Sequence, residues 1–350
     1  MGIINTLAKL NEIADPDLSS IATKYIGWGT KTLRRIAPFY ISSKDMIVDK
    51  KYKVESLDGQ NVIRPKYAKS GYSNIEQDKI NIYLEERQHK VELDHQDLEE
   101  DMSEVEAVGL EACTYPVIES LVYETNALLH DNSNFDSDRE VDVDATGTAA
   151  NSWGAPTTCT PLTNIREGFD KMTLSGRLMD SDTGMKLLIS PYLAKLVINS
   201  DEYKDEVSDR KIIEPVMLEE KLRIVLGRDV ILAEGYYYGE GGGAQFTADS
   251  TCHIIYVEMP SGPMSDVQRY RTNNSTLLVG LRNLELTNPP TAQRIGNAND
   301  DIFRLSGNII ATWGYTGEDQ VTEFRMKSLL RGTVWIHNLP RLVRLKDIVV

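Results

Sequence analysis

The fold of this 350-residue chain is decided between residues 80 and 132. Residues 80–94 read INIYLEERQHKVELD and begin with the apolar–polar alternation that is typical of a half-buried strand. Residues 103–130 read SEVEAVGLEACTYPVIESLVYETNALLH, in which apolar residues recur at steps of three and four. This spacing predicts a helix of about 28 residues, more than twice the mean length in globular proteins. We expect the other layers of the fold to be arranged around it.

Two features modify this long helix. Pro116 lies inside it and predicts a kink or a break near residues 112–114, because proline removes a backbone hydrogen bond and crowds the preceding turn. Acidic residues precede the helix, where free N–H groups and the positive end of the helix dipole stabilise negative charge. These residues are Asp94, Asp97, Glu99, Glu100 and Asp101. We therefore expect a bent rod with an acidic entrance.

The overall composition is that of an ordinary soluble globular protein, with 41% hydrophobic and 26% charged residues. No run of 18 apolar residues predicts a membrane span, and no signal peptide is visible. Cys113, Cys159 and Cys252 form no CxxC pair, which argues against a disulfide framework or a zinc ribbon and suits a reducing compartment. The length exceeds the usual size of a single core, so we expect two or more lobes.

The net charge of −15 is concentrated in one part of the chain. Residues 85–144 contain 19 acidic and three basic side chains, whereas the remainder contains 34 acidic and 35 basic ones. The simplest interpretation is a solvated acidic face. The alternative is a surface that meets a basic partner or repels phosphate, as the wall of a DNA container would. A protein that grips nucleic acid would instead concentrate positive charge. The basic last thirty residues are expected to complement the acidic rod.

The residues before the rod predict an arm and a hairpin. Residues 1–42 have too few apolar residues for a core of their own, so we expect them to lie on the rest of the protein. Residues 43–79 predict an extended hairpin with its turn at Asp58-Gly59 and its return strand at residues 62–69. A proline and several cations mark that return strand as an exposed edge, which suggests a projecting hairpin that rests on another chain or lobe. The cations are Arg64, Lys66 and Lys69.

The residues after the rod predict a second lobe and a closing sheet. Residues 156–238 alternate between helical and strand patterns, and Ser190-Pro191 reads as an N-cap with proline at the first helical position. Gly227 is expected to end a later helix. The last hundred residues predict strands that pair with residues 80–84 on the platform of the rod. The expected strands are residues 276–280, 308–313, 333–337 and 347–350.

No catalytic constellation stands out. The glycine-rich loop from Gly239 to Ala244 formally matches a dinucleotide fingerprint, but the residues after it predict no helix on which a pyrophosphate could sit. The acids from Asp136 to Asp142 approach a calcium loop in spacing, but Val141 stands where the glycine should be. A solvated loop is the simpler interpretation, and an adventitious cation site is the alternative. The histidines are scattered and no GxSxG elbow is present. We therefore expect no enzymatic activity, no cofactor and no metal.

In their order, these elements resemble the major capsid proteins of tailed bacteriophages with the HK97-like fold. The stretch from Ala37-Pro38-Phe39-Tyr40 to Gly71 looks like the end of the N-terminal arm and the E-loop of that family. Residues 82–86 (IYLEE) and 91–94 (VELD) look like the entry to its spine helix. Residues 189–196 (ISPYLAKL) look like the strand and helix of its A-domain. The resemblance covers nearly the whole chain.

The resemblance implies an α+β fold with five regions, among them a compact α/β A-domain. These regions are an N-terminal arm at residues 1–42, an E-loop hairpin at 43–79, a P-domain strand and spine helix at 80–132, an A-domain at 133–270 and closing P-domain strands at 271–350. The implied function is that of a major capsid protein, which assembles into pentamers and hexamers of an icosahedral shell around double-stranded DNA.

The implied partners are further copies of the chain, a portal, a decoration protein and a separate scaffolding protein, without a membrane. A separate scaffolding protein, or removal of a scaffolding segment before Met1, is expected because the chain lacks the long helical prelude of some family members. The implied location is the virion, after assembly in the host cytoplasm. Two alternatives stay open. One is an encapsulin-type compartment with the same fold, and the other is a cytosolic α/β enzyme, against which the missing motifs weigh.

The resemblance also implies where copies of the chain would touch. The hairpin tip would lie over a neighbouring subunit, and loops at residues 132–155 or 239–244 would set the contacts around a ring. Some family members join an E-loop lysine to an asparagine through an isopeptide bond, for which Lys66 and Lys69 are available. The candidate assembly residues are Asp58, Gly59, Arg64, Lys66, Lys69, Gly239, Gly241 and Gly242.

Overall fold

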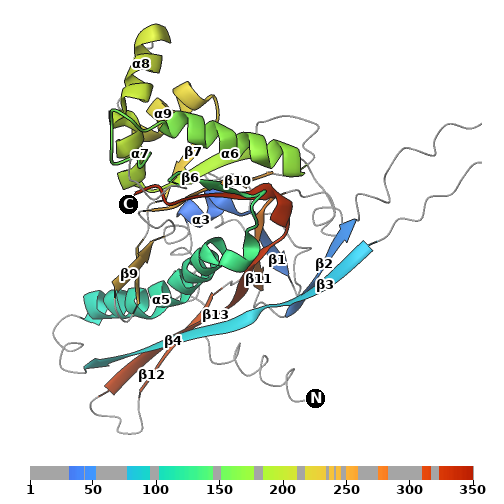
Figure 1. Cartoon of the computed structure of the whole chain (residues 1–350). Coiled ribbons are helices and arrows are strands. Elements are labelled where there is room, and N and C mark those ends of the chain that lie inside the picture. The colour runs from blue at the N-terminus through green and yellow to red at the C-terminus, as the bar shows by residue number, and fades with distance from the viewer. Residues whose placement is uncertain are drawn as a thin grey trace, which may run out of the picture.

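The computed structural model describes the part of the chain that carries the predicted rod and both of its flanks. The described residues are 31–42, 44–52, 77–94, 102–144, 151–176, 184–210, 217–233, 236–239, 242–245, 250–258, 275–282, 310–316 and 323–349. They form two five-stranded sheets and two two-stranded hairpins around one long helix (Figure 1). Among the described helices, none combines the length and apolar character that a membrane crossing requires.

The long helix α5 (Met102–His130) is the predicted rod, and it is continuous through Pro116. Of the two alternatives predicted near residues 112–114, the break is therefore wrong, and the kink stays a prediction. Proline deprives the carbonyl of Ala112 of its helical partner, but Ala112 lies on the exposed side of the helix, where water can donate instead. Asp94 ends a strand rather than standing at the helix entrance, and residues 95–101 lie outside the described residues.

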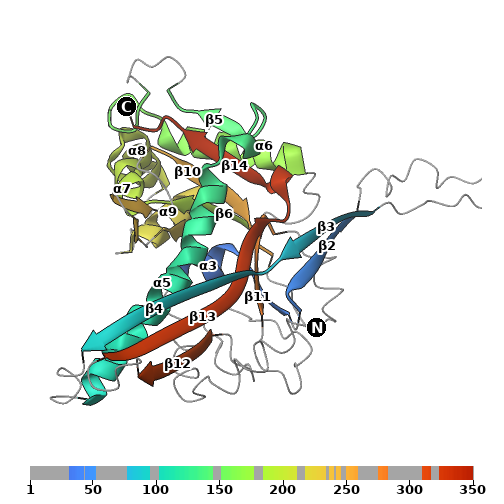
Figure 2. The same cartoon turned by 90° about the horizontal axis from the view of Figure 1, so that it is seen from below.

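The opposite side of α5 is apolar and packs on the first sheet. Leu110, Cys113, Val117 and Leu121, all members of the predicted stripe, are buried, whereas Val108 is exposed. Figure 2 shows α5 running alongside the two longest strands of the sheet, β4 and β13. The period of the sequence thus identified the buried face in part, since Val108 and Ala112 recur at the same spacing but are exposed.

The first sheet has the order β1-β11-β13-β12, with β4 on the other edge of β13. Only the β1–β11 pair is parallel. The strands are β1 (Phe39–Ser42), β4 (Glu85–Asp94), β11 (Leu277–Arg282), β12 (Ile310–Thr316) and β13 (Glu323–Ile336). A short helix, α3 (Lys31–Ile36), precedes β1. The sheet therefore gathers residues from the arm, the flank of the rod and the closing segment.

The second sheet has the order β5-β14-β10-β6-β7 and forms the second lobe with four helices. Its strands are β5 (Glu140–Asp142), β6 (Met185–Ile189), β7 (Asp229–Leu232), β10 (Cys252–Tyr256) and β14 (Leu342–Lys346). The helices are α6 (Pro161–Gly176), α7 (Pro191–Asn199), α8 (Asp201–Arg210) and α9 (Leu218–Leu226), and short 3-10 turns lie at η3 (Asn132–Asn134) and η6 (Leu339–Arg341). The predicted caps are confirmed, since the Ser190 hydroxyl accepts from the N–H of Leu193 and Gly227 adopts a left-handed φ of 67°.

The second sheet is buried on both faces. Leu187 and Ile189 point into a core shared with α6 to α9, whereas Leu188 points into the core shared with α5 and the first sheet. Ile254 and Ile255 divide between the same two cores on the central strand. Successive residues of a strand face opposite sides, so one strand serves both cores. The two expected lobes therefore share a sheet.

Two strand predictions are wrong. Residues 347–349 of the predicted strand 347–350 do not continue the closing strand, because Asp347 takes a left-handed φ of 54° and β14 ends at Lys346. The strand at residues 80–84 does not pair with the closing strands. Residues 80–83 belong to β3 (Gln77–Tyr83), which pairs only with β2 (Met46–Tyr52) among the described strands, and the partner of β13 is β4 instead.

The predicted extended hairpin exists, but its register differs from the expectation. A two-residue turn at Asp58-Gly59 would pair Tyr52 with Pro65, whereas β2 pairs Tyr52 with Gln77. The partner of β2 is therefore β3. The predicted turn at Asp58-Gly59 and the predicted return strand at residues 62–69 lie outside the described residues.

Candidate assembly surface

The hairpin of β2 and β3, here called the projecting hairpin, leaves the body beside the first sheet (Figure 1). Its first cross-strand pair, Met46 and Tyr83, is exposed by 38% and 66% respectively. Ile80, on the opposite side of the ribbon, is 46% exposed. A two-stranded ribbon is marginal alone in water, and large apolar side chains exposed on it indicate a surface that another element covers.

The base of the projecting hairpin is held by a small apolar cluster. Ile47 and Leu84 pack with Leu278 and Trp335 of the first sheet, and Tyr40 completes the cluster. Gly280 makes this contact close, because a Cβ added there would lie 2.7 Å from Ile47 Cδ1 and 2.9 Å from Leu84 Cδ2. Because Gly280 has no side chain, Ile47 and Leu84 of the hairpin base can pack directly against this strand.

A buried carboxylate reinforces the base. Asp49, 1% exposed, accepts hydrogen bonds at Oδ2 from Trp335 Nε1 at 3.2 Å and from His337 Nδ1 at 2.9 Å. The second oxygen, Oδ1, is buried and has no donor among the described residues. Burying a charge is costly unless it is paired, so these two donors fix where Asp49, and with it β2, can lie.

Ion pairs hold the other side of the base. Asp45 pairs with Arg331 at 3.0 Å and with Arg282, and Arg331 also pairs with Glu86 at 2.6 Å. Burial alone would raise the pKa of Asp45, but hydrogen bonds from the two guanidinium groups outweigh it and lower the pKa. The main chain adds a further bond, from the N–H of Leu84 to the carbonyl of Asp45.

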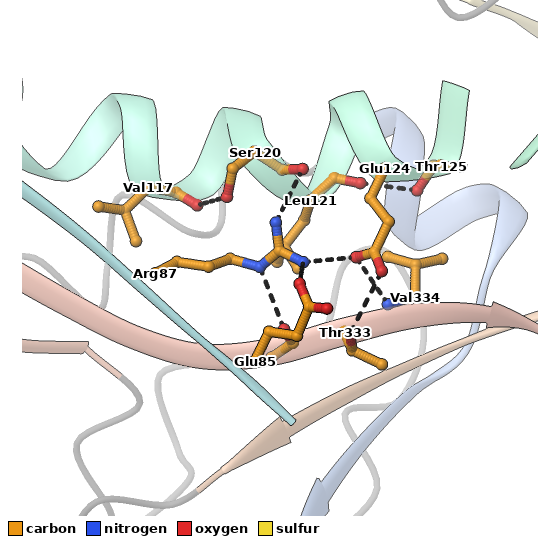
Figure 3. A network of polar contacts seen from close by, with 10 residues as sticks. Glu85, Arg87, Val117, Ser120, Leu121, Glu124, Thr125, Thr333 and Val334 are labelled. Atoms are coloured by element: carbon orange, nitrogen blue, oxygen red, sulfur yellow. Dashed lines mark hydrogen bonds and ion pairs between the residues drawn. The ribbon is translucent and has the colours of Figure 1, made fainter. Parts of the chain in front are cut away.

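Next to the hairpin, a polar network joins β4, α5 and β13 (Figure 3). The Arg87 guanidinium donates to the carbonyls of Gly332 and Ser120 and to Glu124, at 2.7 Å. The Glu124 carboxylate in turn accepts from the N–H of Val334 at 2.9 Å and the hydroxyl of Thr333 at 3.2 Å. Each polar group of this half-buried junction therefore has a partner.

This network replaces a strand. β4 pairs with β13 only as far as Gly332, and beyond that residue Glu124 satisfies the N–H that a neighbouring strand would have bonded. Burial raises the pKa of Glu124, although Arg87 and the Val334 N–H favour its charged form. The helix is thus joined to the sheet by charge as well as by apolar contact.

The candidate residues of the sequence analysis fall into two groups. Gly239 ends β8 (Tyr236–Gly239) and Gly242 begins β9 (Gly242–Gln245), and the two strands form a hairpin near α5. Because β9 follows the loop directly, the dinucleotide interpretation is excluded. The other candidates, which lie outside the described residues, are Asp58, Gly59, Arg64, Lys66, Lys69 and Gly241. Their role in assembly stays a prediction.

The basic last thirty residues were expected to complement the acidic rod, but Arg331, Arg344 and Lys346 pair with acids of its flanks instead. Arg331 pairs with Glu86, and Arg344 pairs with Glu140. Lys346 lies 3.4 Å from Glu140 and pairs also with Asp142. These bases meet acids of the strands that flank the rod. Among the described residues, no group of His, Cys, Asp and Glu is arranged to hold a metal ion.

Sequence reasoning missed most of the residues that make these junctions. Arg87, Glu124, Asp49 and His337 lie far apart in the sequence and match no local motif. Arg35 and Glu219 form a further such pair, at 2.7 Å, which joins α3 to α9. One weak signal in the sequence could have indicated these residues. An acidic residue at a strand or helix position that is expected to be buried requires a partner.

No protein family and no curated protein matches the chain by sequence. Solved structures do match. A phage-related protein from Bordetella bronchiseptica has 13% identity and a TM-score of 0.60, covering 96% of this chain and 97% of that chain. The capsid structure of the cyanophage P-SCSP1u has 9% identity and a TM-score of 0.51, covering 90% and 87%.

These similarities establish the fold. The chain has the HK97-like fold, and the predicted α+β class is confirmed. The identities are too low for an activity to be transferred. The division into five regions stays a prediction, since no comparison addresses the boundaries.

Proposed function

We propose that the chain is the major capsid subunit of a tailed bacteriophage, which assembles into pentamers and hexamers of an icosahedral shell around double-stranded DNA. The observation that carries the proposal is the projecting hairpin on an HK97-like fold. Its base is fixed by Asp49 and Asp45, while Met46 and Tyr83 are left exposed. A ribbon that is positioned accurately but covered on one side only is suited to bind another copy of the chain.

The charge distribution supports a shell that encloses DNA. Acidic side chains dominate residues 85–144, and among the described ones Glu111 on α5 is exposed to solvent. An acidic inner wall would repel phosphate and leave packaged DNA unbound. Under this proposal the DNA is enclosed without recognition of its sequence, and scaffolding, portal and decoration proteins are supplied separately.

The test is sedimentation and electron microscopy of the purified protein and of a variant in which residues 53–76 are replaced by Asn-Gly. Tyr52 and Gln77 are paired, so a two-residue turn can join them without disturbing the stem. The matched control is Asp58→Asn, which retains the chemistry of a turn. We expect closed shells or rings from the native chain and the control, and smaller species from the shortened variant.

A native chain that stays a monomer or dimer in this experiment contradicts the proposal. Shells that form equally well without residues 53–76 would contradict the role of the hairpin and leave the capsid assignment standing. Enclosed protein in place of nucleic acid in shells isolated from the producing cell would favour the encapsulin-type alternative.

A further inference from the structure

The chain changes partner at one residue between the projecting hairpin and the body. β3 pairs with β2 as far as Tyr83, and β4 pairs with β13 from Glu85 onward. Leu84 alone lies between them, and the two strands follow one another almost as one ribbon (Figure 2). The N–H of Leu84 still bonds to the carbonyl of Asp45, so the pairing with β2 ends at Leu84 and the pairing with β13 begins at the next residue. The ribbon can bend at this change of partner without breaking either ladder. Leu84 is therefore a pivot.

We propose that Asp49 is a releasable latch, which holds the projecting hairpin in one orientation on the body and, when opened, lets the hairpin turn about Leu84. Asp49 lies within β2, three residues beyond its first cross-strand pair with β3. Both of its hydrogen-bond donors, Trp335 and His337, belong to the body at the end of β13. Opening these two bonds breaks no bond within the hairpin.

The docked state is balanced between favourable and unfavourable contributions. Two hydrogen bonds and the packing of Ile47 favour it. The burial of Asp49 Oδ1, which meets no donor within the described part of the chain, opposes it, because this oxygen would be hydrated in the released state. A carboxylate that is only half satisfied when buried makes the docked state weaker than a fully paired one, which is the property a releasable contact needs.

The ion pairs at Asp45 do not duplicate the latch. Asp45 precedes β2 and lies beside the pivot, where Leu84 donates to its carbonyl, so its contacts to Arg331 and Arg282 can survive a rotation about that point. Asp49 lies further along the hairpin, so its contacts to Trp335 and His337 would be lost in such a rotation. The pivot and the latch are thus two separate sets of contacts on one strand.

Spin-label distances within one molecule test the inference. Asn81 on β3 and Glu111 on α5 are exposed and accept cysteine labels, while the native Cys113, Cys159 and Cys252 are buried. Labelled protein is diluted in an excess of unlabelled protein, so that distances between copies do not contribute, whatever the assembly state. We expect a single narrow distance for the native chain and a second, separate distance for Asp49→Leu.

A second variant opens the latch by different chemistry. Gly280→Ala places a methyl group 2.7 Å from Ile47 Cδ1 and should also produce the second distance without any change of charge. Asp49→Asn keeps one acceptor and should show a smaller second population than Asp49→Leu. Glu124→Gln, the matched control, alters a partly buried carboxylate of the body and should keep the single distance.

Two results would overturn the inference. One is a single unchanged distance in both Asp49→Leu and Gly280→Ala, with native circular dichroism, since the hairpin would then be held by other contacts. The other is an equal broadening in Glu124→Gln, which would show general loosening of the body. Because all distances lie within one copy, the outcome is independent of whether the chain forms shells.

Discussion

The second sheet and the projecting hairpin are both built from short strands, but they are stabilised in opposite ways. The second sheet buries both faces, with Leu187 and Leu188 on one strand serving two cores. The projecting hairpin buries only its base, through Ile47 and Asp49, and leaves Met46 and Tyr83 exposed. The buried residues of the second sheet stabilise the fold, whereas the exposed apolar residues of the projecting hairpin are available to contact another molecule.

The largest effect on folding is expected in the second sheet. Leu188→Ala should lower the free energy of unfolding by about 2–5 kcal/mol, because Leu188 is fully buried between well-packed layers and truncation leaves a cavity. Urea unfolding followed by circular dichroism measures the loss. If Leu188→Ala lowered the free energy of unfolding less than Ile80→Ala on the exposed hairpin does, the two regions would not differ in stability as described.

The second largest loss of unfolding free energy is expected from the polar network between the rod and the first sheet. Glu124→Ala leaves Arg87 without its carboxylate and the N–H of Val334 without an acceptor. Because both charged side chains are partly exposed, we expect a loss of about 2–3 kcal/mol rather than the full value for a buried pair. Glu111→Ala, on the exposed side of the same helix, is the control and should change the unfolding midpoint little. Equal losses would refute the network.

Acid should weaken the junction of the rod with the second sheet. His253 donates from Nε2 to the carbonyl of Leu129 in the tautomer that bonds it, and burial, with His130 next in importance, lowers its pKa to about 3. A histidine held neutral in the folded state contributes stability that is present above its ordinary pKa of about 6.5 and lost as pH falls toward 3.

This loss should amount to about 2.5 kcal/mol between pH 7 and pH 4.5, at roughly 1.4 kcal/mol for each pH unit below the ordinary pKa. His253→Gln keeps a donor for Leu129 without titrating, so its unfolding free energy should fall less over the same interval. Parallel pH profiles for the two proteins would contradict the assignment. The stability of the second sheet therefore depends on pH through His253, a residue of the sheet and not of the projecting hairpin.

The smallest effect on folding is expected at the exposed hairpin. Tyr83→Ala removes a side chain that is 66% exposed and should change the free energy of unfolding by less than about 0.5 kcal/mol. The same variant should sediment as smaller species than the native chain under conditions where the native chain assembles. A large loss of stability would show that Tyr83 belongs to the core after all, and would remove the distinction between the two regions.

The sequence predicted these regions unequally, for a physical reason. The apolar stripe of α5 and the caps at Ser190 and Gly227 are local patterns, and the structure confirms them. The partner of β2 was not predicted, because Asp58-Gly59 indicates a local turn but does not determine which distant residues pair with β2.

The residues that fix the hairpin were not predictable in the same way. Asp49 meets His337 across 288 positions, and Arg87 meets Glu124 across 37. Such pairs follow from the packing of the finished fold, and no spacing in the sequence encodes them. The burial of acids at predicted strand positions is the one general signal that partners must exist.

The most direct test of the account is electron microscopy of the native chain beside the double variant Met46→Asp, Tyr83→Asp, at equal concentration. Both substitutions place charge on the exposed pair of the projecting hairpin and leave its buried base unchanged. We predict closed shells from the native chain and unassembled subunits or isolated rings from the double variant, with equal unfolding midpoints. Shells of the same size from both proteins would contradict the claim that this face joins one copy of the chain to the next.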